Sequence, residues 1–190
     1  MAINIVTAIQ DRMGFSPFDK TDPNEEQGRS EFKEKNTADH YAQAASIAVL
    51  VGFYQYAQST QGANELLSGS TDGLLPKIFA GKDQEVVNSV ADYGFEPYDR
   101  TRLFMQKIAE ESLAIIRDQQ GKDNKTETLK DFITSQRHNI LVYLPPSLRI
   151  GKIIKNEQLE DRTNKMEGPV SSFMHLIEDF FASKDKTMKF

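Results

Sequence analysis

Few side chains in this sequence are of the types that carry out catalysis or hold a metal ion. There is no cysteine, so thiol nucleophiles, disulfides and cysteine-based metal sites are excluded. The zinc-protease pattern H-E-x-x-H, the phosphate-loop pattern and the serine-hydrolase turn G-x-S-x-G do not occur. His175 and Glu178 lie three residues apart, so they would share one face of a helix, and they are the candidate metal ligands. We predict no catalytic residues and no cofactor.

Basic side chains gather in one segment of the second half of the chain, residues 137–165. Within it, Arg149, Lys152 and Lys155 follow two consecutive prolines and precede the predicted start of the last helix. Lysine and arginine beside a helix N-terminus can hold an anion, because free N–H groups and the helix dipole attract negative charge. These three residues are the candidates for binding a small anionic or amphiphilic ligand. The alternative is an ordered loop that packs on the body through its leucine and isoleucine side chains.

The elements that must position these residues are helices. Apolar residues recur at helical spacing in residues 97–120, in residues 126–143 and near the C-terminal end, whereas the strict alternation typical of strands is absent. Pro97 suits the first turn of a helix and Gly121 suits the position just beyond its end. The pattern predicts an all-α protein, with residues 1–190 forming a single compact domain of about six to eight helices.

Two segments between the helices are predicted to be irregular. Residues 14–30 are rich in proline, glycine, aspartate and serine, and we expect residues 13–30 to form a mobile loop or linker. Residues 145–168 begin with two prolines, which end the preceding helix. The final helix is predicted to start near Pro169, and residues 184–190 are expected to fray.

The most apolar segment, residues 44–54, lies in a helix predicted to begin between residues 31 and 38 and to end near Gln58. A membrane-spanning helix needs about 20 consecutive apolar residues, so this segment is too short to span a bilayer. The first residues also lack the apolar run and cleavage site of a secretory leader. We therefore expect a buried central helix in a soluble, cytoplasmic protein without a membrane span.

The charge of the chain bears on its partners. A net charge of −5 argues against bulk nucleic-acid binding. The charge is uneven, because residues 1–128 are acidic overall and residues 129–165 are mildly basic. This asymmetry could favour head-to-tail contact between copies, although cyclic dimers are the commoner assembly. The predicted partner is another protein or a second copy of the chain.

Short motifs between residues 44 and 95 give a partial resemblance to a known family. They are QGA at 61–63 and LLP at 74–76, which join helices, and QEVV at 84–87, which is part of an amphipathic helix. With them, the segment resembles the YidB-like family of bacterial proteins of unknown function. The resemblance implies a helical fold and a bacterial origin, and it implies no activity and no site residues.

Three classes of function remain open. The first is a non-enzymatic helical interaction or scaffolding protein, favoured by the missing catalytic pattern and by apolar stripes rich in phenylalanine and methionine. The second is a module that binds a small anionic or amphiphilic ligand through the basic residues named above or in a gap between helices. The residues predicted to line such a gap are Phe53, Tyr56, Phe104 and Met105. The third is a metal-dependent enzyme.

Overall fold

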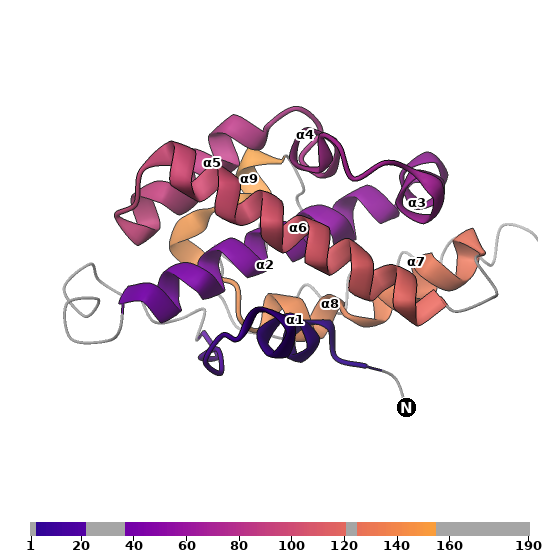
Figure 1. The fold of residues 1–190 in the computed structure, drawn as a ribbon, viewed down its shortest axis with the longest axis horizontal. Coiled ribbons are helices and arrows are strands. Elements are labelled where there is room, and N and C mark those ends of the chain that lie inside the picture. Colours follow the sequence, from indigo (N-terminus) through magenta and orange to yellow (C-terminus); the bar gives the residue numbers. More distant parts are fainter. Residues whose placement is uncertain (1–2, 22–36, 121–124, 155–190) are drawn as a thin grey trace, which may run out of the picture.

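The computed structural model describes residues 3–21, 37–120 and 125–154. Every regular element within these residues is a helix, which confirms the predicted all-α class. In chain order the elements are α1 (Ile5–Met13), α2 (Thr37–Ala57), α3 (Thr60–Ser68), α4 (Leu74–Ile78), α5 (Asp83–Gly94), α6 (Tyr98–Gln120), α7 (Thr126–Ser135), α8 (Arg137–Leu141), the 3-10 helix η2 (Pro146–Leu148) and α9 (Ile150–Ile153) (Figure 1). The described residues thus contain nine α-helices, more than the six to eight predicted for the whole chain.

Helix α2 lies at the centre of the molecule. Figure 1 shows it passing through the middle of the bundle with α6 alongside, and it contacts each of the helices α1 and α3 to α8. Residues 41–54 are all buried, as expected for a helix that is apolar on every side. The predicted central helix is confirmed, with its end at Ala57. None of the described helices combines the length and apolar character needed to cross a lipid bilayer.

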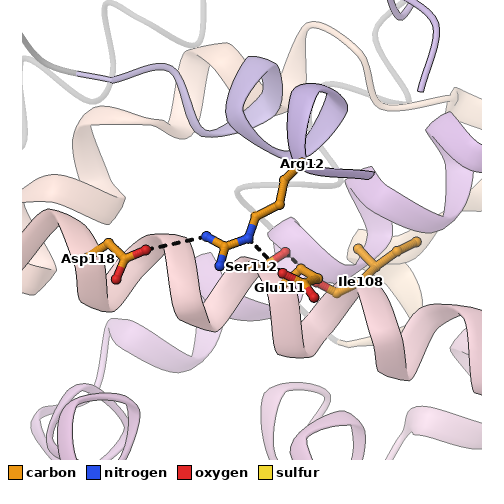
Figure 2. Close-up of polar contacts among 5 residues, drawn as sticks. All are labelled: Arg12, Ile108, Glu111, Ser112 and Asp118. Carbon is orange, nitrogen blue, oxygen red and sulfur yellow. Dashed lines mark hydrogen bonds and ion pairs between the residues drawn. The ribbon is translucent and has the colours of Figure 1, made fainter. Parts of the chain in front are cut away.

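Helix α1 is attached to α6 by apolar and charged contacts. Ile5, Val6 and Ile9 are buried in the shared core. Figure 2 shows Arg12 reaching from α1 to two carboxylates of α6: its Nε lies 2.7 Å from Oε2 of Glu111, and its Nη1 lies 3.3 Å from Oδ2 of Asp118. All three side chains are partly exposed, and exposed ion pairs contribute up to about 1 kcal/mol each. The buried apolar side chains therefore provide most of the attachment.

Residues 15–21 have no regular secondary structure, as predicted, and they pack along the helices. The ring of Phe15 contacts that of Phe104, and the ring of Phe18 contacts that of Tyr143. The side-chain amide of Gln43 accepts a hydrogen bond from the Asp19 N–H at 3.0 Å and donates one to the Asp19 carbonyl at 2.8 Å. This part of the predicted loop is therefore held on the body of the protein. Residues 22–30 lie outside the described residues.

The helix predicted over residues 126–143 is wrong as a single element, because the structure divides it into α7 and α8. The break is at Gln136, a buried polar residue whose side-chain oxygen accepts a hydrogen bond from the backbone N–H of Ile5 at 3.1 Å. Asn139 donates to the same oxygen at 3.1 Å. The Ile5 N–H belongs to the first turn of α1, where backbone donors lack partners within their own helix. Gln136 thus accepts a hydrogen bond from the first turn of α1. The turn between α7 and α8 places its side chain beside that helix.

The irregular loop predicted over residues 145–168 is also corrected in its first part, where η2 and α9 form. Leu148 and Ile150 are buried against the core, and the hydroxyl of Ser89 on α5 donates to the Leu148 carbonyl at 3.0 Å. The helical turns η2 and α9 are stabilised because both pack on α5. Residues 155–168 and the helix predicted from Pro169 lie outside the described residues.

Candidate functional site

The large apolar side chains that face solvent lie between the end of α5 and the second turn of α6, in residues 94–103, which we name the α5–α6 corner. Phe95 is 70% exposed and Leu103 is 73% exposed, and they are the exposed large hydrophobic residues of the described part of the chain. Single exposed apolar side chains are common on soluble proteins. The exposure of Phe95 and Leu103 therefore indicates a binding surface only where the surrounding backbone and packing support that interpretation.

Phe95 has a backbone conformation that favours glycine. It ends α5 with φ 54° and ψ 37°, in the left-handed region, and its N–H donates to the Ala91 carbonyl. The N–H of Glu96 also donates to the Ala91 carbonyl, at 3.0 Å. This arrangement is the common glycine-ended helix terminus with phenylalanine at the glycine position. A residue with a side chain in this conformation costs about 1–2 kcal/mol.

The glycine at this helix end is Gly94, one position before Phe95. Its lack of a side chain leaves room for the ring of Tyr41. A Cβ atom on Gly94 would lie 2.3 Å from Cδ2 of Tyr41, far inside the contact distance. The Tyr41 ring cannot move aside easily, because it stacks on Phe104 with ring centroids 5.1 Å apart. Its hydroxyl donates to Oγ1 of the buried Thr101 at 3.1 Å. Phe95 is therefore presented on a rigid base that joins α2, α5 and α6.

Several charged residues lie close in sequence to Phe95 and Leu103. Arg100 lies 3.0 Å from Glu96, one helical turn earlier, and Arg102 lies 4.0 Å from Asp83 at the start of α5. Asp99 is exposed in the first turn of α6. A rigid aromatic or aliphatic anchor within a polar rim is the usual composition of a protein-binding surface. No chemistry beyond binding is suggested by these residue types.

The structure describes two of the three predicted anion-binding residues. Arg149 and Lys152 are exposed, on either side of the buried Ile150 and Gly151. Within the described residues, neither head group forms a hydrogen bond or an ion pair. Lys155 lies outside the described residues, so the three-residue site stays a prediction.

The predicted metal ligands, His175 and Glu178, also lie outside the described residues. Within the described ranges, no group of three or more histidine, aspartate and glutamate side chains is placed to hold a metal ion. The residues predicted to line a ligand gap take part in packing instead. Phe53 and Met105 are fully buried core residues, and Phe104 stacks on Tyr41.

Tyr56 and Glu65 form a hydrogen-bonded pair in which the pKa values of both groups are shifted. The Tyr56 hydroxyl donates to Oε2 of Glu65 at 2.6 Å, and the Gln61 amide donates to Oε1 at 3.0 Å. Burial, followed by the hydrogen bond and charge of Glu65, raises the pKa of Tyr56 to about 12. The hydrogen bonds from Tyr56 and then Gln61 lower the pKa of Glu65. Both shifts move away from neutrality, so the pair is unsuited to proton transfer near pH 7.

Sequence reasoning did not find the α5–α6 corner. Leu103 stands off the apolar stripe of α6, which is a weak signal because surface leucines are frequent. A glycine near a helix end commonly takes the left-handed position, so the sequence Gly94-Phe95 does not indicate that Phe95 takes it. Only the structure shows that the left-handed residue is Phe95.

Comparison with known proteins adds no assignment. No protein-family model, no curated protein and no solved structure matches the chain.

Proposed function

We propose that this chain is a non-enzymatic helical interaction protein that binds another protein, or a second copy of itself, through the α5–α6 corner. The observation that carries the proposal is Phe95, which is exposed and has a left-handed backbone conformation at the same time. Glycine at this position would relieve the backbone and remove an apolar ring from water. The phenylalanine therefore contributes little to the isolated fold, and its ring is available for a contact.

The base under Phe95 supports the same proposal. An anchor residue binds well when little conformational freedom is lost on binding, and a phenylalanine on a fixed backbone has two side-chain torsions to lose. The packing of Tyr41 against Gly94 fixes that backbone. Burial of a phenylalanine or leucine side chain stabilises a complex by roughly 1.5–3 kcal/mol each. Two such anchors are enough to dominate a small interface.

The expectations of a bacterial origin and a cytoplasmic location remain part of the proposal. The resemblance of residues 44–95 to the YidB-like family supports the first, and the lack of cysteine supports the second. Neither expectation is needed for the binding argument.

The test is capture of partners with tagged full-length chain in cells that naturally carry the gene, together with sedimentation of the purified protein to detect self-association. The double variant Phe95→Gly/Leu103→Gln should bind at least about tenfold more weakly than the original chain, because both anchors are lost. Ala80→Gly is the matched control, since Ala80 is also an exposed left-handed residue and its change removes no ring. Equal binding by the original chain and the double variant would contradict the proposal, as would the absence of any association.

A further inference from the structure

We propose that the peptide bond between Asp72 and Gly73, in the connection from α3 to α4, is a site of spontaneous aspartate isomerisation in the folded protein. The product is an isoaspartyl residue, whose free carboxylate is the group that isoaspartyl methyltransferases modify. The site lies outside the α5–α6 corner, and the inference does not depend on the proposed function.

The sequence contains one dipeptide of the kind that isomerises readily. Asp72-Gly73 is the single Asp-Gly pair of the chain, and the related Asn-Gly pair does not occur. Isomerisation begins when the backbone nitrogen that follows an aspartate attacks its side-chain carboxyl carbon. A side chain on the attacking residue obstructs this approach, whereas glycine permits close approach and a wide range of backbone angles.

The structure leaves both reacting groups of this pair open to water. Residues 70–73 are all exposed, and a Cβ atom on Gly73 would meet nothing within 4 Å. Within the described residues, the Asp72 carboxylate forms no hydrogen bond or ion pair, and the Gly73 N–H has no acceptor. Attack by the Gly73 nitrogen would therefore break no contact that the described part of the chain provides.

The flanking residues hold the connection at its two ends. On the α3 side, Nη2 of Arg117 donates to the Gly69 carbonyl at 2.6 Å. On the α4 side, Leu74 is buried in the core. Between these points the Ser70 hydroxyl accepts a hydrogen bond from the Asp72 N–H at 3.0 Å. The Asp-Gly pair thus lies in a short exposed turn, and exposed connections are generally more mobile than the helices they join.

The isomerisation proceeds in two steps, and water is its only co-reactant. The Gly73 nitrogen loses its proton and bonds to Cγ of Asp72, one carboxyl oxygen leaves as water, and a succinimide ring closes. Water then adds to the main-chain carbonyl carbon of Asp72, and the bond from that carbon to the Gly73 nitrogen breaks. The main chain now runs through Cβ and Cγ, and the former carbonyl carbon is a free carboxylate. The water released in the first step is regained in the second, so mass and charge are unchanged.

The exposed position of the turn also determines who can reach the product. The new carboxylate belongs to a residue whose neighbours on both sides are exposed, so a methyltransferase can reach it while α3 and α4 stay folded. The main chain gains one methylene group directly before α4. Because Leu74 and Leu75 are buried, the added length is taken up by the exposed turn.

The test ages the purified full-length protein at neutral pH and physiological temperature, folded and, in parallel, unfolded in urea. Mass spectrometry with electron-transfer fragmentation locates isoaspartate, because it distinguishes two linkages of equal mass. Methyl transfer from S-adenosylmethionine, catalysed by an isoaspartyl methyltransferase on the intact folded chain, gives the total. Asp72→Glu keeps the charge and would need a larger ring for the same attack. Asp92→Glu is the matched control, at an exposed position inside α5.

In the folded protein we expect at least about tenfold more isoaspartate at position 72 than at position 92, where the helix engages the next N–H in a hydrogen bond. Asp72→Glu should lose most of the methyl transfer, and Asp92→Glu should retain it. Isoaspartate at position 72 in the unfolded chain alone would overturn the inference, because the folded turn would then protect the bond. Its absence from both states, equal amounts at positions 72 and 92, or full methyl transfer to Asp72→Glu would overturn it as well.

Discussion

Helices α1 and α5 end with the same hydrogen bond and different residues. In α1, the N–H of Phe15 donates to the Gln10 carbonyl at 2.9 Å, and the left-handed residue between the helix and this bond is Gly14, with φ 70°. In α5, the Glu96 N–H makes the corresponding bond at 3.0 Å, and the left-handed residue is Phe95. The first helix end is built from the residue with the lowest backbone cost. At the second helix end, phenylalanine takes the left-handed conformation at a higher backbone cost, and its ring is exposed to solvent.

The difference shows that a glycine near a helix end can have either of two tasks. Gly14 provides backbone freedom, and a Cβ atom at its position would meet nothing within 4 Å. Gly94 provides space, since its own position is helical and a Cβ atom there would collide with Tyr41. Substitutions at the two helix ends therefore test two different physical terms, steric overlap and backbone strain.

The largest effect is expected for Gly94→Ala. The new methyl group would force the Tyr41 ring off Phe104 and away from Thr101, and overpacking of this kind costs typically 1–3 kcal/mol. We expect the free energy of unfolding, measured by urea denaturation, to fall by about 3 kcal/mol. Asp92→Ala, at an exposed position of the same helix, should change it by less than about 0.5 kcal/mol. A loss at Gly94 no larger than that control would break the comparison, because Tyr41 would then be free to move.

A smaller loss is expected for Gly14→Ala. There is room for the methyl group, so the cost is confined to the left-handed backbone, less a part returned by the lower entropy of the unfolded alanine chain. We expect the free energy of unfolding to fall by about 1 kcal/mol in the same urea measurement. A loss as large as that of Gly94→Ala would mean that α1 has packing constraints at its end that the structure does not contain.

The smallest effect, a gain in stability and not a loss, is expected for Phe95→Gly. Relief of the left-handed phenylalanine should raise the free energy of unfolding by about 0.5 kcal/mol, after the greater flexibility of unfolded glycine is subtracted. Ala80→Gly should give a gain of similar size, because Ala80 has φ 51° at the end of α4. Both gains are measured by comparing the thermal unfolding midpoints of the two variants with that of the original chain. A loss of stability in Phe95→Gly would show that the ring supports the fold, and the argument for an interaction role would then fall.

The parts of the fold that the sequence predicted are those set by local patterns. The helix over residues 97–120 was bounded by Pro97 and Gly121, and the structure begins it at Tyr98 and ends it at Gln120. The central helix followed from the apolar segment over residues 44–54, which only Ser46 and Gly52 interrupt. In both, the residues that decide the outcome lie within the element or directly beside it, so a single sequence contains the information.

The parts that the sequence did not predict depend on contacts between distant residues. The break at Gln136 is stabilised by Ile5, 131 positions earlier, and no local pattern encodes that pairing. The α5–α6 corner depends on Tyr41, which lies in α2 and excludes a side chain at position 94. Exposure is likewise a property of the assembled bundle. Phe95 and Leu103 could be recognised as surface residues only after the helices around them were placed.

The hydrogen bond between Ile5 and Gln136 also bears on how the protein is made. A ribosome adds about 5–20 residues per second, so Gln136 is synthesised on the order of ten seconds after Ile5. Helix α6, on which α1 packs, is completed only shortly before. Helix α1 is therefore synthesised well before α6 and α8, the two helices with which it makes most of its contacts. Although α1 is the first described helix to be translated, it is among the last to be secured.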